Sequence, residues 1–194
     1  MQTLAMSSLT ICGIDELAGH SERKVTHVLS VVDPNWPELI AFRTFGAHRR
    51  TILEFHDIID AAPGQVLPVA DHVAQILDFG GELDRSSAER QDGHLLVHCH
   101  MGVSRSTAAM LTLLAQANPD VEEDRLFERL REIRPQAWPN SLMIGFADDL
   151  LKRGGKLNAA LGRHYAHQIG RDVRYIDWMT HLGRGRELAM GGHH

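Results

Sequence analysis

Short apolar runs separated by polar breakers dominate the first half of the chain. Residues 10–12, 27–32 and 52–55 are each predicted to form a strand, because β-branched and large apolar residues cluster there. The second run stops at Asp33-Pro34, a pair that breaks strands. Residues 95–97, Leu-Leu-Val, form a compact apolar run typical of a buried strand.

Helical spacing of the apolar positions begins in the middle of the chain. A helix is predicted from Pro68, a favourable first helical residue, to about Gly80-Gly81. Residues 107–117 are apolar on nearly every face, which indicates a helix enclosed by protein. Asp120 and Glu123 match a capping box that would open the next helix. A further helix is expected over residues 140–153. Residues 157–168 are a candidate for another helix, and residues 175–182 are a candidate segment for packing Trp178.

Strands interleaved with helices, followed by a helix-rich second half, indicate an α/β fold. We expect a central, mostly parallel sheet flanked by helices. A chain of 194 residues suits one domain of ordinary size. We assign that domain to residues 1–153, and a basic C-terminal extension, whose structure the pattern does not define, to residues 154–194.

The composition is that of a globular protein, with 43% hydrophobic and 23% charged residues. No apolar run approaches the roughly 20 residues needed to cross a bilayer. The first dozen residues lack the basic and apolar regions of a signal peptide. A cytoplasmic protein without a membrane span is therefore expected.

Charge is distributed unevenly along the chain, whose net charge is −5. Residues 1–151 hold 12 basic and 22 acidic residues, whereas residues 152–194 hold 8 basic and 3 acidic ones. A basic tail can contact nucleic acid or an acidic partner. This tail has no dense basic run, so a solvated or self-docked tail is favoured and no nucleic-acid partner is expected. The ending 190–194 resembles part of a purification tag and is left out of the fold prediction.

The segment 98–106, His-Cys-His-Met-Gly-Val-Ser-Arg-Ser, joins the buried strand to the enclosed helix. Such a turn points backbone N–H groups and a helix N-terminus into one concavity, which favours an anion. Gly102 permits the backbone angles of a cradle, and Arg105 offers a planar fork for two phosphate oxygens. The loop is therefore predicted to bind phosphate.

Cys12 and Cys99 are the two cysteines, and a buried inert thiol is the default interpretation of each. Cys99 differs because it stands at the mouth of the anion loop, where N–H groups, the helix dipole and Arg105 stabilise a thiolate. Such a thiolate is a nucleophile at neutral pH. Ser106 can donate a hydrogen bond to the sulfur when it leaves. Cys99, Arg105 and Ser106 are therefore predicted to be catalytic.

This loop, His98-Cys99-x5-Arg105-Ser106, resembles the CX5R signature, or P-loop, of the cysteine-based protein tyrosine phosphatases. Its ending Gly-Val-Ser-Arg-Ser is similar to the dual-specificity branch of that superfamily, in its bacterial type. Residues 11–17 and 25–32 resemble the family's early strands, and residues 134–140 resemble the segment before its late helix. The resemblance covers roughly residues 8–153 of the chain.

The resemblance implies a phosphatase-like catalytic domain over residues 1–153, which acts on phosphate monoesters through a cysteinyl-phosphate intermediate. The expected partner is a phosphorylated protein or peptide carrying phosphotyrosine, with phosphoserine and phosphothreonine as further substrates. No cofactor and no metal is expected, and no oligomeric state is predicted. His98 is predicted to orient the loop by hydrogen bonding, and the histidines outside the loop are predicted to lie at the surface. The phosphate-binding residues would be His100, Met101, Gly102, Val103, Ser104 and Arg105.

A leaving alkoxide or phenoxide needs a proton, so a carboxylic acid should reach the ester oxygen from another loop. The family supplies this acid as an Asp on an upstream loop that follows a strand. Asp57 occupies that place after the 52–55 run, and Asp60 is its rival. The interval from Asp57 to Cys99 is longer than usual for the family, with an expected insertion around residues 85–91.

Three other functions stay open. A phosphatase for phosphoinositides or small metabolites is one, although lipid-directed relatives tend to carry Lys in the loop and this loop has none. A sulfurtransferase can use the same kind of loop. A non-catalytic phosphoprotein-binding module or an adaptor working through its basic tail is the third, and the intact Cys99 and Arg105 argue against a module that only binds.

Overall fold

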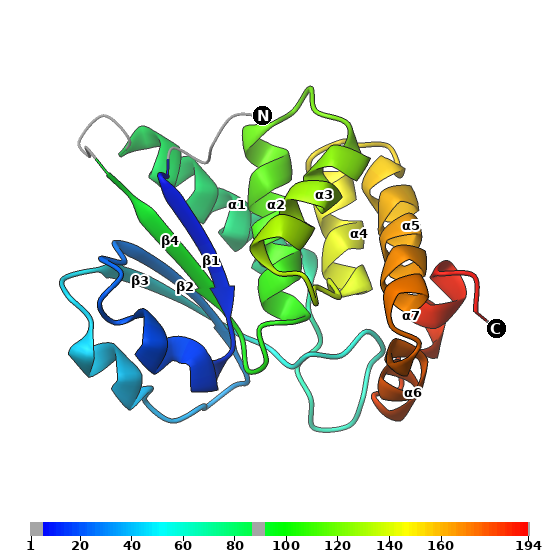
Figure 1. Cartoon of the computed structure of the whole chain (residues 1–194), viewed down its shortest axis with the longest axis horizontal. Helices are drawn as coiled ribbons and strands as arrows, with labels where there is room; N and C mark the ends of the chain where they lie inside the picture. The colour runs from blue at the N-terminus through cyan, green and yellow to red at the C-terminus, as the bar shows by residue number, and fades with distance from the viewer. Residues whose placement is uncertain (1–5, 87–91, 194) are drawn as a thin grey trace.

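A four-stranded parallel sheet organises the first half of the chain (Figure 1). The computed structural model describes residues 6–86 and 92–193. The strand order is β1 (Ser8–Cys12), β4 (His94–His98), β2 (His27–Val32) and β3 (Arg49–Glu54), and each neighbouring pair is parallel. This confirms the predicted α/β class. Residues 87–91 of the expected insertion and His194 of the tag-like ending lie outside the described residues.

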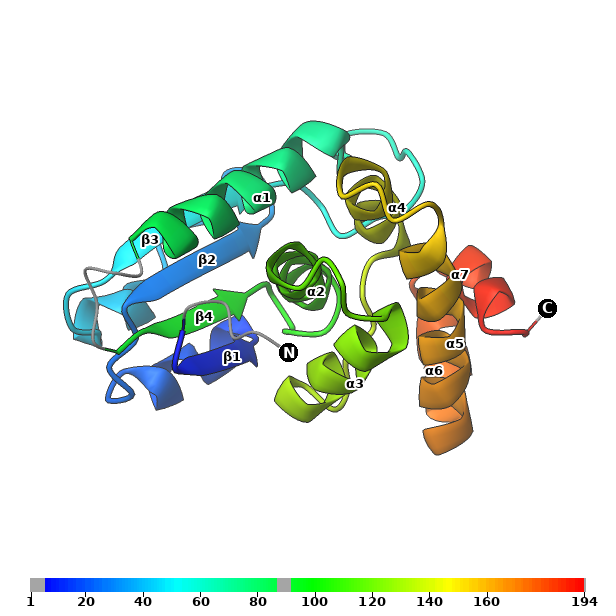
Figure 2. The same cartoon turned by 90° about the horizontal axis from the view of Figure 1, so that it is seen from above.

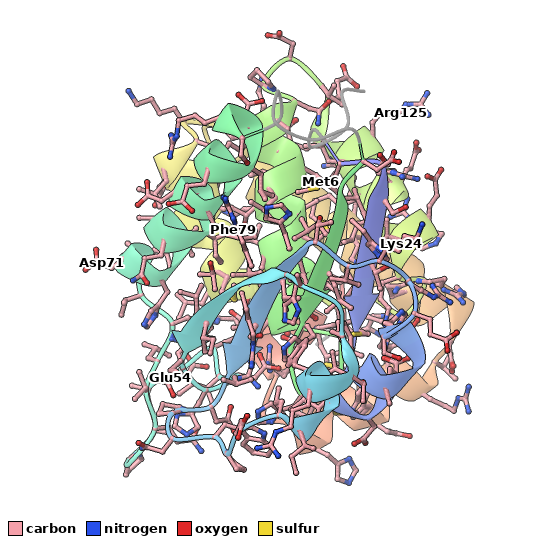
Figure 3. The ribbon with its side chains drawn as sticks, turned by 90° about the vertical axis from the view of Figure 1, so that its left-hand side faces the viewer. Met6, Lys24, Glu54, Asp71, Phe79 and Arg125 are labelled. Carbon is pink, nitrogen blue, oxygen red and sulfur yellow. The ribbon has the colours of Figure 1, made fainter. Side chains whose placement is uncertain are left out.

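The two central strands form the middle of the core. Every residue of β2 and β4 is buried, as expected for parallel strands covered on both faces. One face carries the main apolar core and the larger helices; the other carries a smaller core under two 3-10 helices, η1 (Ile14–His20) and η2 (Ile40–Thr44). Figure 3 labels Phe79 of the main core, which is 5% exposed, and Asp71, which lies on the outer side of the same helix.

The helix after the CX5R loop lies at the centre of the helical layer. Its residues from Arg105 to Ala115 are all buried, which confirms the enclosed helix predicted from its apolar faces. Figure 2 shows it between the sheet and the later helices. The helices in chain order are α1 (Ala70–Arg85), α2 (Arg105–Ala117), α3 (Glu123–Ile133), α4 (Ser141–Leu150), α5 (Lys156–Arg171), α6 (Arg174–His181) and α7 (Gly185–Met190).

Helix α1 does not end at Gly80-Gly81, as the sequence pattern predicted, but continues to Arg85. The reason is close packing against α2. A Cβ on Gly80 would stand 2.0 Å from the side-chain oxygen of Gln116 and 2.8 Å from Leu113. Gly80 is therefore a contact point between two helices and not a helix stop.

Several local predictions were wrong for reasons that the structure makes clear. Residues 14–17 of the expected early strand belong to η1, where the Glu16 carboxylate accepts a hydrogen bond of 2.6 Å from the Gly13 N–H and so ends the strand. The N-cap of α3 is Glu122 and not Asp120, and no side chain caps it. Three histidines expected at the surface are buried: His27, His94 and His164.

The C-terminal segment packs onto the same core as the sheet. Trp138 stacks on Tyr165 of α5, with ring centroids 4.2 Å apart, and on Tyr175 of α6, at 5.2 Å. The Trp138 indole also donates a hydrogen bond of 2.7 Å to Glu187 of α7. These contacts place the three last helices beside the carboxyl end of the sheet. Among the described residues, none of the helices combines the length and the apolar character that a bilayer span requires.

Candidate active site

The CX5R loop starts where β4 ends and stops where α2 begins. Cys99 is 2% exposed, and its Sγ lies 3.1 Å from the Ser106 hydroxyl in the first turn of α2. Gly102 has a φ of +69°, a conformation that favours glycine. The loop therefore curls around a space at the helix N-terminus, with the sulfur and one hydroxyl at its base.

Two neighbouring segments brace this loop from behind. A Cβ on Gly102 would lie 2.4 Å from the Cys12 carbonyl carbon, so β1 presses directly on the loop. On the other side, the Arg134 Nε donates to the Gly102 carbonyl at 2.9 Å. The Arg134 guanidinium also forms two hydrogen bonds, of 2.9 and 2.7 Å, to the Glu16 carboxylate. Such a bidentate pair fixes the geometry of the arginine that holds the loop.

Arg105 is buried, and its hydrogen-bond donors are only partly paired. Its Nη1 donates to the Asp33 carboxylate at 2.6 Å and to the Phe55 carbonyl. Its Nε is buried and has no partner among the described residues. A buried donor without an acceptor costs about 1–3 kcal/mol. An anion in the loop would satisfy this donor, so the guanidinium is held ready for an oxyanion.

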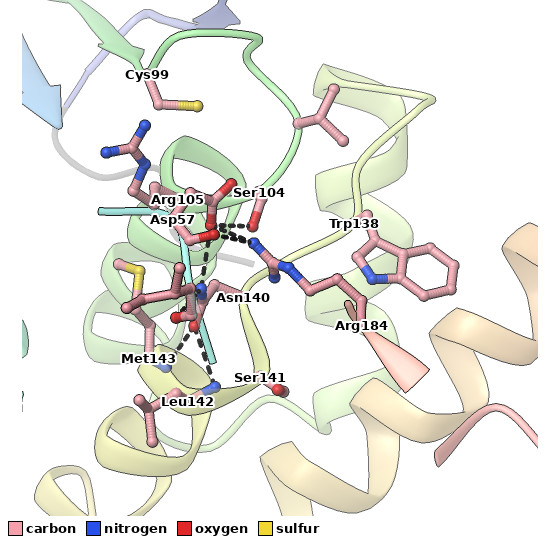
Figure 4. A network of polar contacts seen from close by, with 12 residues as sticks. Asp57, Cys99, Ser104, Arg105, Trp138, Asn140, Ser141, Leu142, Met143 and Arg184 are labelled. Carbon is pink, nitrogen blue, oxygen red and sulfur yellow. Dashed lines mark hydrogen bonds and ion pairs between the residues drawn. The ribbon is translucent and has the colours of Figure 1, made fainter. Parts of the chain in front are cut away.

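Asp57 lies on the loop after β3 and faces the CX5R loop (Figure 4). Its Oδ1 accepts three hydrogen bonds: from the Ser104 hydroxyl at 2.8 Å, from the Asn140 amide at 3.1 Å and from the Arg184 guanidinium at 2.6 Å. Burial raises the pKa of Asp57, but Arg184 and Arg105 outweigh it, and the pKa is lowered overall. The carboxyl group is therefore ionised in the ligand-free protein at neutral pH.

Asp60, the rival candidate, lies elsewhere. Its side chain is 67% exposed and stands 3.3 Å from Arg186. It is not among the residues that line the pocket over the loop. The structure therefore brings Asp57 to Cys99 and Arg105 and leaves Asp60 at the surface.

The pocket above the loop encloses about 290 Å³. Cys99, Arg105 and Asp57 line its polar base, together with loop residues His100, Met101, Val103 and Ser104. Part of its wall is apolar and comes from two segments far apart in the sequence: Ile58, and Trp178, Met179 and Leu182. The base therefore suits an anionic group, and the wall suits an apolar group attached to it.

The two histidines of the loop do different things. The His98 Nε2 lies 2.7 Å from the Ser30 hydroxyl, and burial lowers the pKa of His98 to about 3, so this side chain is a neutral support. His100 packs on the Trp36 ring, with centroids 4.0 Å apart, and burial together with Arg105 lowers its pKa. Met101 is 60% exposed at the rim. In the described part of the chain, no group of three or more His, Cys, Asp or Glu residues is arranged to hold a metal ion.

Comparison with known proteins finds phosphatases that are similar to the chain. Protein phosphatase Slingshot homolog 3 of Homo sapiens is 36% identical to the chain over 97 residues, which are 49% of this chain and 14% of that protein. Dual specificity protein phosphatase MPK-4 of Drosophila melanogaster is 24% identical over 146 residues, 75% of this chain and 34% of that protein. The Yvh1 phosphatase domain from Chaetomium thermophilum superposes with a TM-score of 0.51 at 26% identity, covering 77% of this chain and 93% of that one.

These relatives are protein phosphatases, and the chain shares the fold of the cysteine-based protein tyrosine phosphatase superfamily. Human DUSP28 shares its fold, with a TM-score of 0.51 and 19% identity over 77% of this chain. No family model matches the chain. The chain spans only 14% to 34% of the length of the curated relatives it matches.

Sequence reasoning missed several residues that complete this phosphatase-type site. Asp33, which holds Arg105, directly follows β2 at the carboxyl edge of the sheet, and that position was a usable signal. Asn140 stands at the start of the helix expected over residues 140–153, and its side chain accepts from the N–H groups of Leu142 and Met143 as the N-cap of α4. Its amide also donates to Asp57. Nothing in the sequence pointed to Arg184, which stands 127 residues from Asp57.

Proposed function

We propose that the chain is a protein phosphatase that hydrolyses phosphotyrosine, and phosphoserine or phosphothreonine as further substrates, through a cysteinyl-phosphate on Cys99. One observation carries the proposal: the buried sulfur, its 3.1 Å contact to Ser106 and the unpartnered Nε of Arg105 meet at the base of one pocket. These are a nucleophile, a group that eases its departure and an oxyanion donor. Phosphoryl transfer needs an attacking atom in line with the leaving oxygen and donors that stabilise the charge of the transferring group.

In the first step the Cys99 thiolate attacks phosphorus, the S–P bond forms and the ester P–O bond breaks. Arg105 and the loop N–H groups hold the charge on the three equatorial oxygens. The electron pair of the broken bond goes to the ester oxygen, which takes a proton from Asp57. The lowered pKa of Asp57 is compatible with this role, because the substrate can bring the proton. A phosphate monoester loses its second proton with a pKa of about 6, so near neutrality part of it arrives as the monoanion.

In the second step water attacks the cysteinyl-phosphate. The P–O bond to water forms, the S–P bond breaks and the Asp57 carboxylate takes the water proton. The Ser106 hydroxyl, 3.1 Å from Sγ, stabilises the departing thiolate by a hydrogen bond. Phosphate leaves, and the free thiolate is restored.

The apolar wall favours an aromatic phosphate ester. Trp178, Met179 and Leu182 offer apolar surface that a tyrosyl ring can cover and that a short seryl ester would leave exposed. Phosphorylated proteins or peptides are therefore the proposed partners. A thiolate nucleophile needs a reducing compartment, which favours the cytoplasmic location expected from the sequence.

The test compares hydrolysis of a phosphotyrosyl peptide with that of an aryl phosphate whose phenol is already acidic. Cys99→Ser is expected to abolish both activities. Asp57→Asn should lower kcat on the peptide about 100-fold or more, and much less on the acidic aryl ester, because general acid catalysis is worth about 10²–10⁴-fold where the leaving group needs a proton. Asp60→Asn is the matched control and should keep wild-type rates.

Two results would contradict the proposal. Full activity of Cys99→Ser would remove the covalent mechanism. Tight binding of the phosphotyrosyl peptide by the wild type without any release of phosphate would identify a binding module instead.

A further inference from the structure

A buried arginine from the C-terminal segment reaches the proposed general acid. Arg184 lies between α6 and α7, and its side chain is 3% exposed. Its Nη2 donates to Oδ1 of Asp57 at 2.6 Å and to the Asp57 backbone carbonyl at 2.8 Å. One guanidinium nitrogen therefore holds both the side chain and the main chain of the same residue.

Glu187 holds Arg184 from behind. The Arg184 Nη1 lies 3.2 and 3.3 Å from the two carboxylate oxygens of Glu187, whose side chain is fully buried. Glu187 is in turn fixed by the Trp138 indole at 2.7 Å and the Ser141 N–H at 2.8 Å. The aromatic stack of Trp138 on Tyr165 thus supports the arginine that supports Asp57.

Arg184 lines the same pocket, but its two terminal nitrogens are committed to Asp57 and Glu187. Among the described residues, the Arg105 Nε is a buried donor that lacks a partner. We therefore expect Arg105 to hold the phosphate and Arg184 to act on the chemistry through Asp57. Arg184 also differs from its neighbour Arg186, which is 55% exposed and contacts the Ile59 carbonyl and Asp60.

Among the described residues, the hydrogen bonds to the Asp57 carboxylate all go to one oxygen. Ser104, Asn140 and Arg184 converge on Oδ1, and Figure 4 shows no contact drawn to the other oxygen. A proton on Oδ1 would displace three donors, whereas a proton on Oδ2 displaces none. The bonded oxygen is the anchor, and the free oxygen is the one that can carry a proton.

We propose that Arg184 is a positioning residue for proton transfer, which anchors Oδ1 of Asp57 so that Oδ2 delivers the proton to the leaving oxygen. This inference rests on the proposed function of Asp57 as the general acid. It assigns to the C-terminal segment, whose Trp178, Met179 and Leu182 line the apolar wall of the pocket, a part in the chemistry as well.

Arg184 has an electrostatic consequence as well. Its charge favours the Asp57 carboxylate and so lowers the pKa of Asp57, and its removal should raise that pKa. Since kcat reports the enzyme–substrate complex, in which Asp57 must hold the proton, the alkaline limb of the kcat profile should move to higher pH without Arg184. The other charged or titratable groups around Asp57 stay in place in such a variant; they are Asp33, His56, Cys99, His100, Arg105, Tyr165 and Glu187.

The experiment measures kcat and KM against pH for Arg184→Met, Arg184→Lys and the control Arg186→Met, on the phosphotyrosyl peptide and on the acidic aryl phosphate. For Arg184→Met we expect kcat on the peptide to fall about tenfold or more, as a part of the general acid effect, and kcat on the aryl ester to change less than threefold. Its alkaline limb should shift upward by at least about half a pH unit. Arg184→Lys should recover part of the peptide rate, and Arg186→Met should match the wild type.

A double variant distinguishes the positioning of Asp57 by Arg184 from a general disturbance of the site. In the Asp57→Asn background, Arg184→Met should cause no further loss on the peptide, because its effect passes through the missing acid. Arg184→Met leaves Glu187 buried without its cation and can fail to fold. Arg184→Gln combined with Glu187→Gln removes both charges together, and the same loss and pH shift are expected from it.

The outcomes distinguish the two proposals. Absence of hydrolysis by the wild type would reject the proposed function itself. If the wild type is active but the Arg184 variants lose the same fraction of kcat on both esters and their alkaline limb does not move, the role of Arg184 is overturned and the phosphatase function stays intact. An equal further loss in the Asp57→Asn background would overturn it as well.

Discussion

Replacing Gly102 by alanine tests whether the loop must press against β1. The substitution adds one carbon at a residue whose φ is +69°. That carbon would stand 2.4 Å from the Cys12 carbonyl carbon, 2.6 Å from the Gly13 nitrogen and 2.7 Å from the Cys12 oxygen. All three atoms are backbone, so no side chain can turn away to make room.

The magnitude follows from two separate costs. An alanine in the left-handed region costs about 1 kcal/mol relative to glycine. Carbon atoms prefer a separation of about 3.5–4.0 Å, so loop and strand must part by about 1 Å. Overpacking of this kind costs about 1–3 kcal/mol. A total near 3 kcal/mol lowers the Tm of a chain this size by about 6–12 °C.

The effect on catalysis should exceed the effect on stability. The sulfur of Cys99 and the N–H groups of the loop move with Gly102, and a misplacement of about 1 Å costs about 100-fold in rate. The assay is kcat/KM on an aryl phosphate together with Tm by calorimetry. Gly13→Ala tests the steric contact without the backbone cost. Gly13 has an ordinary φ of −87°, but its Cβ would stand 2.8 Å from the His100 carbonyl oxygen.

Gly170→Ala supplies the matched control. Gly170 lies in α5 with nothing within 4 Å of an added Cβ, so alanine there should raise stability by about 0.5–1 kcal/mol and leave kcat/KM unchanged. A Gly102→Ala protein with wild-type kcat/KM and an unchanged Tm would refute the reasoning, since the contact with β1 would then be unnecessary.

Three further results are expected. Burial lowers the pKa of His98 to about 3 and that of His164 to about 4, whereas the same side chains in the unfolded chain take up a proton near pH 6.5. The free energy of unfolding should therefore fall as the pH drops below 6.5, by up to about 1.4 kcal/mol per pH unit for each histidine. Chemical denaturation at a series of pH values measures this fall. Gly80→Ala should destabilise the fold by about 1–3 kcal/mol in urea titrations, because its Cβ has no space against α2. Burial raises the pKa of the Cys12 thiol to about 12, so peptide mapping after alkylation of the folded protein should find Cys99 modified and Cys12 unmodified.

The sequence predicts those parts of the fold and of the site whose residues lie close together along the chain. The run 95–97, the loop 98–106 and the apolar helix behind it are contiguous, so one pass along the chain places nucleophile, cradle and arginine together. The choice between Asp57 and Asp60 already needed the three-dimensional structure. The two lie three residues apart on one loop, and only the packing of that loop against Asn140 and Ser104 turns Asp57 inward.

The errors in the sequence prediction also have physical causes. A glycine pair stops a helix when it faces water, but Gly80 faces another helix, and the sequence does not record which side the partner takes. Residues 14–17 have enough apolar character for a strand. The carboxylate of Glu16 instead bonds the N–H of Gly13, and its other partner, Arg134, lies 118 residues away.

The charge asymmetry of the chain shows why the C-terminal segment could not be interpreted from composition. A surplus of basic residues there suggested an external anionic surface as one possibility. In the structure the acidic partners come from the chain itself: Arg153 pairs with Glu123, Arg163 with Asp124, Arg184 with Asp57 and Arg186 with Asp60. Each pair joins the basic end to the acidic first part of the chain. The pairs of Arg163 and Arg186 join side chains that are more than half exposed, and exposed pairs contribute little. The pair of Arg153 with Glu123 is largely buried, but neither residue lines the pocket over the loop. The pair of Arg184 with Asp57 differs because its arginine is 3% exposed and its carboxylate lines the same pocket as Cys99. The composition recorded the surplus charge of the whole segment, but burial decides which one of its arginines acts on the site.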